Sequence, residues 1–206
     1  MPRLPDPETR NRLLDAADRL LARHGFRRMT IEAVAAEAGI GKGSVYLHFE
    51  SKEEVALSCI DRMAETLAVR LERLASQGGP VLPRLRAMLR TRVLDRFDYA
   101  RHHARSIDEK LAVMRQNLLE RRRLHFELEA EILTRLIGEG IRSGELRRVV
   151  PERAAGALIE ATNALLPYSL SVRELGRRAA LARRLEEVLN LLLAGLERQA
   201  TVPNSP

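Results

Sequence analysis

The chain contains little cysteine and few aromatic residues, and these shortages exclude several classes of protein. A single cysteine, Cys59, among 206 residues excludes an internal disulfide framework and a cysteine-rich metal site. Aromatic residues make up 3% of the chain and tryptophan is absent, whereas leucine, alanine, arginine and glutamate dominate. This composition is typical of a helical protein, and a β-sandwich is not expected.

Long apolar runs are also missing. No stretch approaches the roughly 18 residues of a membrane span, and residues 1–7 contain no apolar segment of signal-peptide length. We therefore expect a cytoplasmic protein with no membrane partner. The formal net charge is +7, but most of the excess lies beyond residue 52, so bulk charge alone does not identify a nucleic-acid partner.

Patterns typical of catalytic and metal sites are absent too. The sequence has no HExxH, no phosphate-cradling glycine loop and no nucleophile elbow. His102 and His103 are adjacent, so on a helix they would lie about 100° apart. His125 and Glu129 offer only two possible ligands, which is fewer than a zinc site needs. We expect neither an enzyme nor a bound metal or cofactor.

Hydrophobic periodicity predicts an all-α fold, and capping residues divide its first part. Asp6 and Pro7 begin an amphipathic helix that ends at Gly25. Thr30 can cap a short second helix, which Gly39 would end in the left-handed conformation. The next segment, residues 42–49, follows at once, so the order is helix, glycine-containing turn and short helix. That order is the layout of a helix-turn-helix.

The rest of the chain is predicted to be helical as well. Ser51 and Glu54 match a capping box that begins a long helix, which ends near residue 77. Near Gln116 and Asn117 one long helix would fit as well as two. Beyond Pro80 we expect helices near residues 83–98, 105–116, 118–142, 151–168 and 175–198.

The short helix at residues 42–49 could enter the major groove of DNA. A turn of about 100° per residue places Val45 and Phe49 on one face, where they can anchor the segment. The other face offers hydroxyl, imidazole, ammonium and apolar groups that suit phosphates and base edges, and Gly43 would let the backbone approach the duplex. The candidate DNA-binding residues are Thr30, Lys42, Gly43, Ser44, Tyr46, Leu47, His48 and Lys52.

The segment TIEAVAAEAGIGKGSVYLHFESKEEV, with the preceding helix that ends in LLARHGFRRM, resembles the N-terminal domain of the TetR family of transcriptional regulators. The resemblance covers about residues 9–57. It implies an all-helical homodimer that binds double-stranded operator DNA through two such domains. Gly41 departs from the family pattern, where a small polar cap is common, and Leu47 stands where many relatives have an aromatic or polar residue. By position, the resemblance assigns DNA contacts to Thr30, Lys42, Ser44, Tyr46, His48 and Lys52.

The resemblance also implies a division of the chain. We expect a helix-turn-helix DNA-binding domain at residues 1–52, a ligand-binding and dimerisation domain at 53–200 and a flexible tail at 201–206. The long helix after Ser51 would join the two domains as a lever. In the family, a small molecule binds the larger domain and lowers the affinity for DNA.

Two apolar stripes predict a dimer interface. One lies in residues 151–168 and the other in the last helix. A monomer could bury both stripes internally, but the family pairs its last two helices with their symmetry mates in a four-helix bundle. The expected interface residues are Leu158, Ala161, Leu165, Leu185, Leu189, Leu192 and Leu196.

An effector pocket is less clearly marked. Aromatic, imidazole and amide side chains among Leu, Ala and Arg helices are its candidates, although Asn163 would serve equally as an interface hydrogen-bonding group. The candidates are Phe97, Tyr99, His102, His103, Met114, Asn117, His125, Phe126, Asn163 and Tyr168.

The sequence therefore predicts a DNA-binding regulator, most simply a repressor released from its operator by an unidentified small-molecule effector. An activator, or a regulator without a ligand, would have the same fold. A helical protein-binding module without DNA affinity is a third reading, and it predicts no salt-sensitive binding to DNA.

Overall fold

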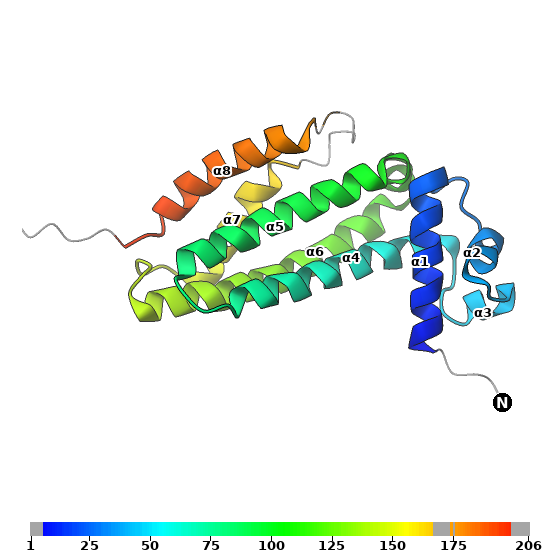
Figure 1. The fold of residues 1–206 in the computed structure, drawn as a ribbon, viewed down its shortest axis with the longest axis horizontal. Helices are drawn as coiled ribbons and strands as arrows, with labels where there is room; N and C mark the ends of the chain where they lie inside the picture. Colours follow the sequence, from blue (N-terminus) through cyan, green and yellow to red (C-terminus); the bar gives the residue numbers. More distant parts are fainter. Residues whose placement is uncertain (1–5, 167–173, 175, 199–206) are drawn as a thin grey trace, which may run out of the picture. The chain divides into compact units, whose positions relative to one another are not determined.

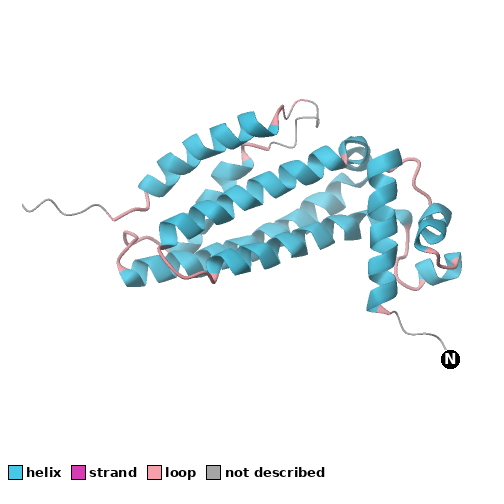
Figure 2. Cartoon of the chain, in the orientation of Figure 1, coloured by secondary structure: helices cyan, strands magenta, loops and turns pink. Residues whose placement is uncertain are grey.

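The structure is a computed structural model that describes residues 6–166, 174 and 176–198, without the side chains of residues 105–115. These residues form eight helices, and the predicted all-α class is confirmed (Figures 1 and 2). They contain no strand, only one isolated antiparallel bridge between Leu146 and Glu197. The helices are α1 (Pro7–His24), α2 (Ile31–Ala38), α3 (Lys42–Tyr46), α4 (Lys52–Ala75), α5 (Val81–His102), α6 (Ala104–Ser143), α7 (Pro151–Asn163) and α8 (Arg178–Ala194).

The predicted start of α1 is confirmed at the level of single hydrogen bonds. The carboxylate of Asp6 accepts from the backbone amides of Glu8 at 3.2 Å and Thr9 at 3.0 Å. Pro7 takes the first helical position, where a missing amide hydrogen costs nothing. Gly25 then ends the helix with a φ of 82°, a conformation that L side chains rarely adopt.

Residues 104–143 form one helix rather than the two that the sequence left open. Gln116 and Asn117 lack the glycine or proline that would end a helix, so the chain continues through them. The next helix, α7, ends at Asn163, earlier than the predicted residue 168. None of the described helices is long and apolar enough to cross a bilayer.

The chain divides into two compact units. The described part of the first unit is residues 6–66 and 98–123, and the second unit holds the other described residues. Side chains of α4 enter both cores, Val55 the first and Leu71 the second. The predicted boundary at residues 52 and 53 follows the motif and stays a prediction, while the first turns of α4 pack into the helix-turn-helix core.

Two contacts stabilise the second unit, one at the start of α5 and one at the end of α6. The carboxylate of Glu145 accepts from the backbone amides of Val81 at 2.7 Å and Leu82 at 2.8 Å, which caps the start of α5. Gly140 allows a close approach, because a Cβ there would lie 2.6 Å from Leu146 Cγ. Residues 140–146 therefore pack tightly against the end of α6 and the start of α5.

Candidate nucleic-acid interface

The turn between α2 and α3 is built from two caps of different kinds. Thr30 Oγ1 accepts from the backbone amide of Ala33 at 3.1 Å, so α2 has the predicted side-chain cap. Gly39 ends α2 with a φ of 66°, in the left-handed region that favours glycine. Gly41 stands at the N-cap of α3 and, because glycine has no side chain, provides no side-chain hydrogen bond there. These caps fix the direction in which α3 leaves the turn.

Two buried side chains anchor α3. Val45 and Phe49 are 0% and 2% exposed and belong to the first unit's core, which confirms their predicted inward orientation. The regular helix ends at Tyr46 and not at the predicted residue 49. The amides of His48 and Phe49 both donate to the carbonyl of Val45 at 3.0 Å, so the chain makes one more turn. Because of this turn, Val45 and Phe49 still lie on the buried face and Tyr46 and Leu47 on the exposed face, as predicted.

The other face of this segment is open. Tyr46 and Leu47 are 51% and 52% exposed, while Ser44 and His48 are half-buried. A Cβ added at Gly43 would meet no atom within 4 Å, so packing within the chain does not require glycine there. A glycine on an open helical face leaves room for a second molecule to approach the backbone.

The two lysines of this region are held differently. Lys42 Nζ lies 2.5 Å from Glu32 Oε1, and both side chains are more than half exposed. The hydrogen bond and charge of Glu32 raise the pKa of Lys42. Lys52 Nζ donates to the carbonyl of Arg27 at 3.2 Å and lies 4.4 Å from the ring centroid of Phe26. Lys52 is thus positioned by two neutral groups, a backbone carbonyl and an aromatic ring.

The start of α4 completes this surface. Ser51 Oγ accepts from the backbone amide of Glu54 at 3.1 Å, which confirms one half of the predicted capping box. The free amides of the first turn of α4 lie beside Lys52 in the sequence, and such amides attract phosphate groups.

The predicted pocket residues are distributed over both units. Phe97, Phe126 and Asn163 belong to the second unit, whereas Tyr99, His102, His103 and Asn117 belong to the first. The side chain of Met114 and all of Tyr168 lie outside the described residues.

A buried polar cluster, which the sequence did not predict, occupies the second unit. Arg92 is 1% exposed and donates to Glu129 Oε2 at 2.6 Å, Thr162 Oγ1 at 2.8 Å and Asn163 Oδ1 at 2.7 Å. Arg96 pairs with the other oxygen of Glu129. Burial lowers the pKa of Arg92 to about 10, although Glu129 opposes the shift, so Arg92 stays charged at neutral pH.

Phe126 lies against the same cluster. The guanidinium groups of Arg92 and Arg96 are each 5.0 Å from its ring centroid, within the range of a cation–π interaction. Two of the predicted pocket residues, Phe126 and Asn163, therefore contact one buried arginine. The sequence signal for this arginine is its spacing, since Arg92 stands four and three residues after the buried Met88 and Leu89 of α5.

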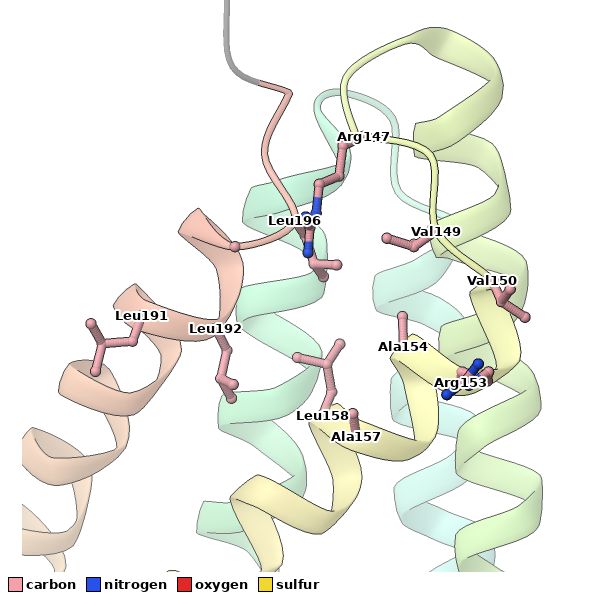
Figure 3. A pocket seen from close by; sticks show the side chains of 11 residues that line it. Arg147, Val149, Val150, Arg153, Ala154, Ala157, Leu158, Leu191, Leu192 and Leu196 are labelled. Atoms are coloured by element: carbon pink, nitrogen blue, oxygen red, sulfur yellow. The ribbon is translucent and has the colours of Figure 1, made fainter.

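The predicted interface residues separate into covered and open positions. Leu158, Leu185, Leu189 and Leu196 are buried within the single chain, and their place in a dimer interface stays a prediction. Ala161, Leu165 and Leu192 are partly exposed, and Leu191, which was not predicted, is 79% exposed. Between α7 and α8 lies an open groove of about 560 Å³, shown in Figure 3. Its lining includes Val150, Arg153, Ala154, Ala157, Leu191 and Leu192.

Comparison with known proteins agrees with the helix-turn-helix geometry. Residues 13–59 match the family model for bacterial regulatory proteins of the tetR family. The fatty acid metabolism regulator protein of Bacillus subtilis is 26% identical over 153 residues, which cover 73% of this chain and 77% of that protein. Several other curated regulators match over 54 to 82 residues, less than half of their own length.

Solved structures extend the likeness to the whole fold. A transcriptional regulator from Cytophaga hutchinsonii superposes with a TM-score of 0.76 at 19% identity, over 90% of this chain and 97% of that one. FadR from Bacillus subtilis, solved in complex with stearoyl-CoA, gives 0.62 at 20% identity, over 91% and 99%. The helix-turn-helix, the eight described helices and these relatives together support a transcriptional regulator of the tetR family, whose family model matches residues 13–59.

Proposed function

We propose that the chain is a homodimeric repressor that binds operator DNA through α3 and leaves it when a small-molecule effector binds. The observation that carries the proposal is the contrast along residues 42–49. Val45 and Phe49 are buried, while Tyr46 and Leu47 between them are half exposed. A short helix with fixed anchors and an open face is what entry into a major groove requires.

The exposed face supplies both kinds of contact that a DNA-binding helix needs. Tyr46 and Lys42 suit phosphate oxygens, which position the protein on the duplex. Leu47 suits the methyl group of thymine, and Ser44 can bond to a base or a phosphate. Gly43 lets the helix backbone approach, and His48 adds a ring at the end of the face.

Phosphate binding would continue beyond α3. Lys52 is held by Phe26 and the carbonyl of Arg27 next to the first amides of α4. Thr30 accepts from the amide of Ala33 and its hydroxyl hydrogen-bonds to Glu32, so a phosphate would compete with that carboxylate for the hydroxyl hydrogen. Together these groups would bind the backbone on either side of the groove.

A second copy of the chain is the occupant that we propose for the groove between α7 and α8. Leu191, which is 79% exposed, lines this groove together with Val150, Ala154 and Ala157, so the apolar side chains form one continuous patch. Pairing of these helices with their symmetry mates would cover them. The two α3 helices could then meet half-sites about 34–36 Å apart.

We further propose a long-chain acyl-CoA as the effector. FadR of B. subtilis, which shares this fold, was solved with stearoyl-CoA. Such a ligand joins an apolar chain to phosphates, and the helices of the second unit offer leucines and arginines. To release the DNA tenfold, it must bind the DNA-incompetent state about 1.4 kcal/mol more tightly.

DNA binding is tested by fluorescence anisotropy on the promoter region of the chain's own gene. The wild type should bind with an affinity that falls steeply with salt. A Lys42→Ala, Tyr46→Ala double variant should bind at least tenfold more weakly, and Arg148→Ala, which removes a charge from an exposed position before α7, should bind like the wild type. Equal affinities for all three proteins would refute the assignment of α3.

The dimer and the effector are tested separately. Sedimentation should show a dimer that Leu191→Glu dissociates, while Leu124→Glu, at a 52% exposed position of α6, should leave it intact. Stearoyl-CoA should lower the affinity for DNA, and free coenzyme A should not. If no acyl-CoA changes the affinity, the acyl-CoA part of the proposal is wrong and the regulator responds to another ligand or to none. The position of the operator relative to the promoter distinguishes repression from activation. An operator placed where the bound protein can recruit RNA polymerase would indicate an activator.

A further inference from the structure

Three side chains that can bind a metal ion converge in the first unit. They are Asp18 of α1, His102 at the end of α5 and His103 in the turn before α6. One ligand atom from each lies within 4.8 Å of the others. Asp18 is far from the two histidines in the sequence, so no motif connects the three residues.

The orientation of His103 is the strongest indication of a ligand. His103 is 1% exposed, and its Nδ1 lies 3.1 Å from the carbonyl oxygen of Tyr99, which can only accept a hydrogen bond. In the neutral ring the proton therefore belongs on Nδ1, and Nε2 presents a lone pair. This Nε2 is buried without a hydrogen bond, although it lies 3.1 Å from Asp18 Oδ1.

His103 Nε2 and Asp18 Oδ1 therefore face one another with a lone pair on each atom, which is a repulsive arrangement. A cation bound between the two atoms would make it attractive. A proton needs only these two groups, whereas a metal ion needs further ligands, and the exposed His102 ring stands beside them, 4.8 Å from the His103 ring centroid. The third ligand favours the metal ion.

We propose that Asp18, His102 and His103 bind a divalent transition-metal ion, with Zn²⁺ as the preferred ion. Zinc–ligand bonds of about 2.0–2.2 Å place neighbouring tetrahedral ligands about 3.3 Å apart. The 3.1 Å between His103 Nε2 and Asp18 Oδ1 fits that spacing. The ligand atoms lie within 4.8 Å of one another, so the widest separation would have to shorten by about 1.5 Å, and the exposed His102 is the side chain that would have to turn toward the ion. The fourth position would be open to water.

The surroundings of the three residues suit a metal site. The bond from His103 Nδ1 to the Tyr99 carbonyl is the outer-shell contact that usually orients a metal-binding histidine. The Tyr99 ring packs on that of His103 at 4.2 Å between centroids. Arg62, whose charge also acts on Asp18, is paired with Asp15 at 2.6 Å. Imidazole and carboxylate ligands together select zinc, copper or nickel over magnesium or calcium.

The test is calorimetric titration of the full chain, without a histidine tag, with Zn²⁺, followed by absorption spectroscopy of the Co²⁺-loaded protein. We expect one ion per chain and Co²⁺ bands of a four- or five-coordinate site. His102→Gln changes an exposed side chain and should not impair folding, and it should weaken binding at least tenfold. Asp18→Asn should do the same. His24→Gln removes an exposed histidine from the last turn of α1, outside the cluster, and should bind like the wild type.

Two results would overturn the proposal. One is the absence of Zn²⁺ binding below about 100 µM, an affinity weaker than about 5.5 kcal/mol by the conversion of 1.4 kcal/mol per tenfold. The other is equal affinity of the His102→Gln variant and the wild type, which would place the ion elsewhere. Neither result depends on DNA or on an effector, so the metal site and the proposed repressor function are tested independently.

Discussion

The two units place their charges in opposite ways, and two glutamates illustrate the difference. Glu129 in the second unit is 1% exposed and lies between Arg92 and Arg96. Glu32 in the first unit is 61% exposed and pairs with Lys42. Among the described residues, the buried charged side chains Arg84, Arg92 and Glu129 all belong to the second unit. The described buried charges thus lie in the second unit, whereas the ion pairs of the first unit, such as Arg19–Glu37 and Lys42–Glu32, lie at or near its surface.

The enclosed charges have a physical consequence. The Glu129 carboxylate pairs with two guanidinium groups, the buried one of Arg92 and that of Arg96, which is 15% exposed. Desolvation makes such groups costly unless each is paired and hydrogen-bonded.

The largest effect is expected when the enclosed carboxylate is lost. Glu129→Gln keeps the size of the side chain but leaves Arg92 and Arg96 without a counter-charge, so the free energy of unfolding should fall by about 3–5 kcal/mol. Urea denaturation of the full chain measures the change. A double variant, Arg92→Met with Glu129→Gln, should be more stable than Glu129→Gln alone. A loss below about 1 kcal/mol would mean that water reaches the cluster and that the contrast between the units is small.

A second variant concerns the anchors of α3. Phe49 is 2% exposed, and its ring lies 5.3 Å from the guanidinium carbon of Arg10. Phe49→Ala should cost about 3 kcal/mol, because it removes a buried ring and leaves a cavity. Tyr46→Ala, three residues away on the open face, should change stability by less than about 0.5 kcal/mol. Similar losses in both variants, measured by denaturation, would contradict the assigned faces.

The faces of α3 could be predicted from the sequence because they depend on neighbouring residues. The cap at Thr30, the left-handed Gly39 and the inward Val45 and Phe49 each involve positions within a few residues, and all four are found. The family resemblance added the use of the open face. The predicted end of α3 was late by three residues, because the last turn is irregular.

The contacts that the sequence missed join distant residues. Arg92 meets Glu129 and Thr162, which lie 37 and 70 positions away, and His103 meets Asp18 from another helix. Periodicity shows that a residue faces inward but not which residue faces it, because the partner depends on how the helices pack. For the same reason periodicity left open whether the stripe with Leu185 and Leu189 meets a second copy or the chain's own core, in which both leucines are buried.

The helix cap at Thr30 should have an intermediate effect. Thr30→Ala removes the acceptor for the amide of Ala33 and should lower stability by about 1 kcal/mol. Thr30→Ser keeps the hydroxyl and should restore most of the loss. Denaturation curves of the three proteins measure both changes. If alanine and serine variants were equally stable, the side chain would not act as a cap.

The smallest change in stability is expected at the exposed carboxylate. Glu32 pairs with Lys42 in water, where such pairs contribute less than about 1 kcal/mol. The hydrogen bond and charge of Lys42 lower the pKa of Glu32, so Glu32 is ionised at neutral pH and holds a negative charge next to the proposed DNA-binding face. Glu32→Gln should therefore leave the denaturation curve almost unchanged.

Glu32→Gln should also tighten DNA binding several-fold, because Lys42 is freed to meet a phosphate, and should steepen the slope of log affinity against log salt by about 1. A Glu→Gln substitution would thus lower the stability of the protein at position 129 but raise its affinity for DNA at position 32. Unchanged DNA affinity and salt slope would mean that Lys42 does not contact the duplex.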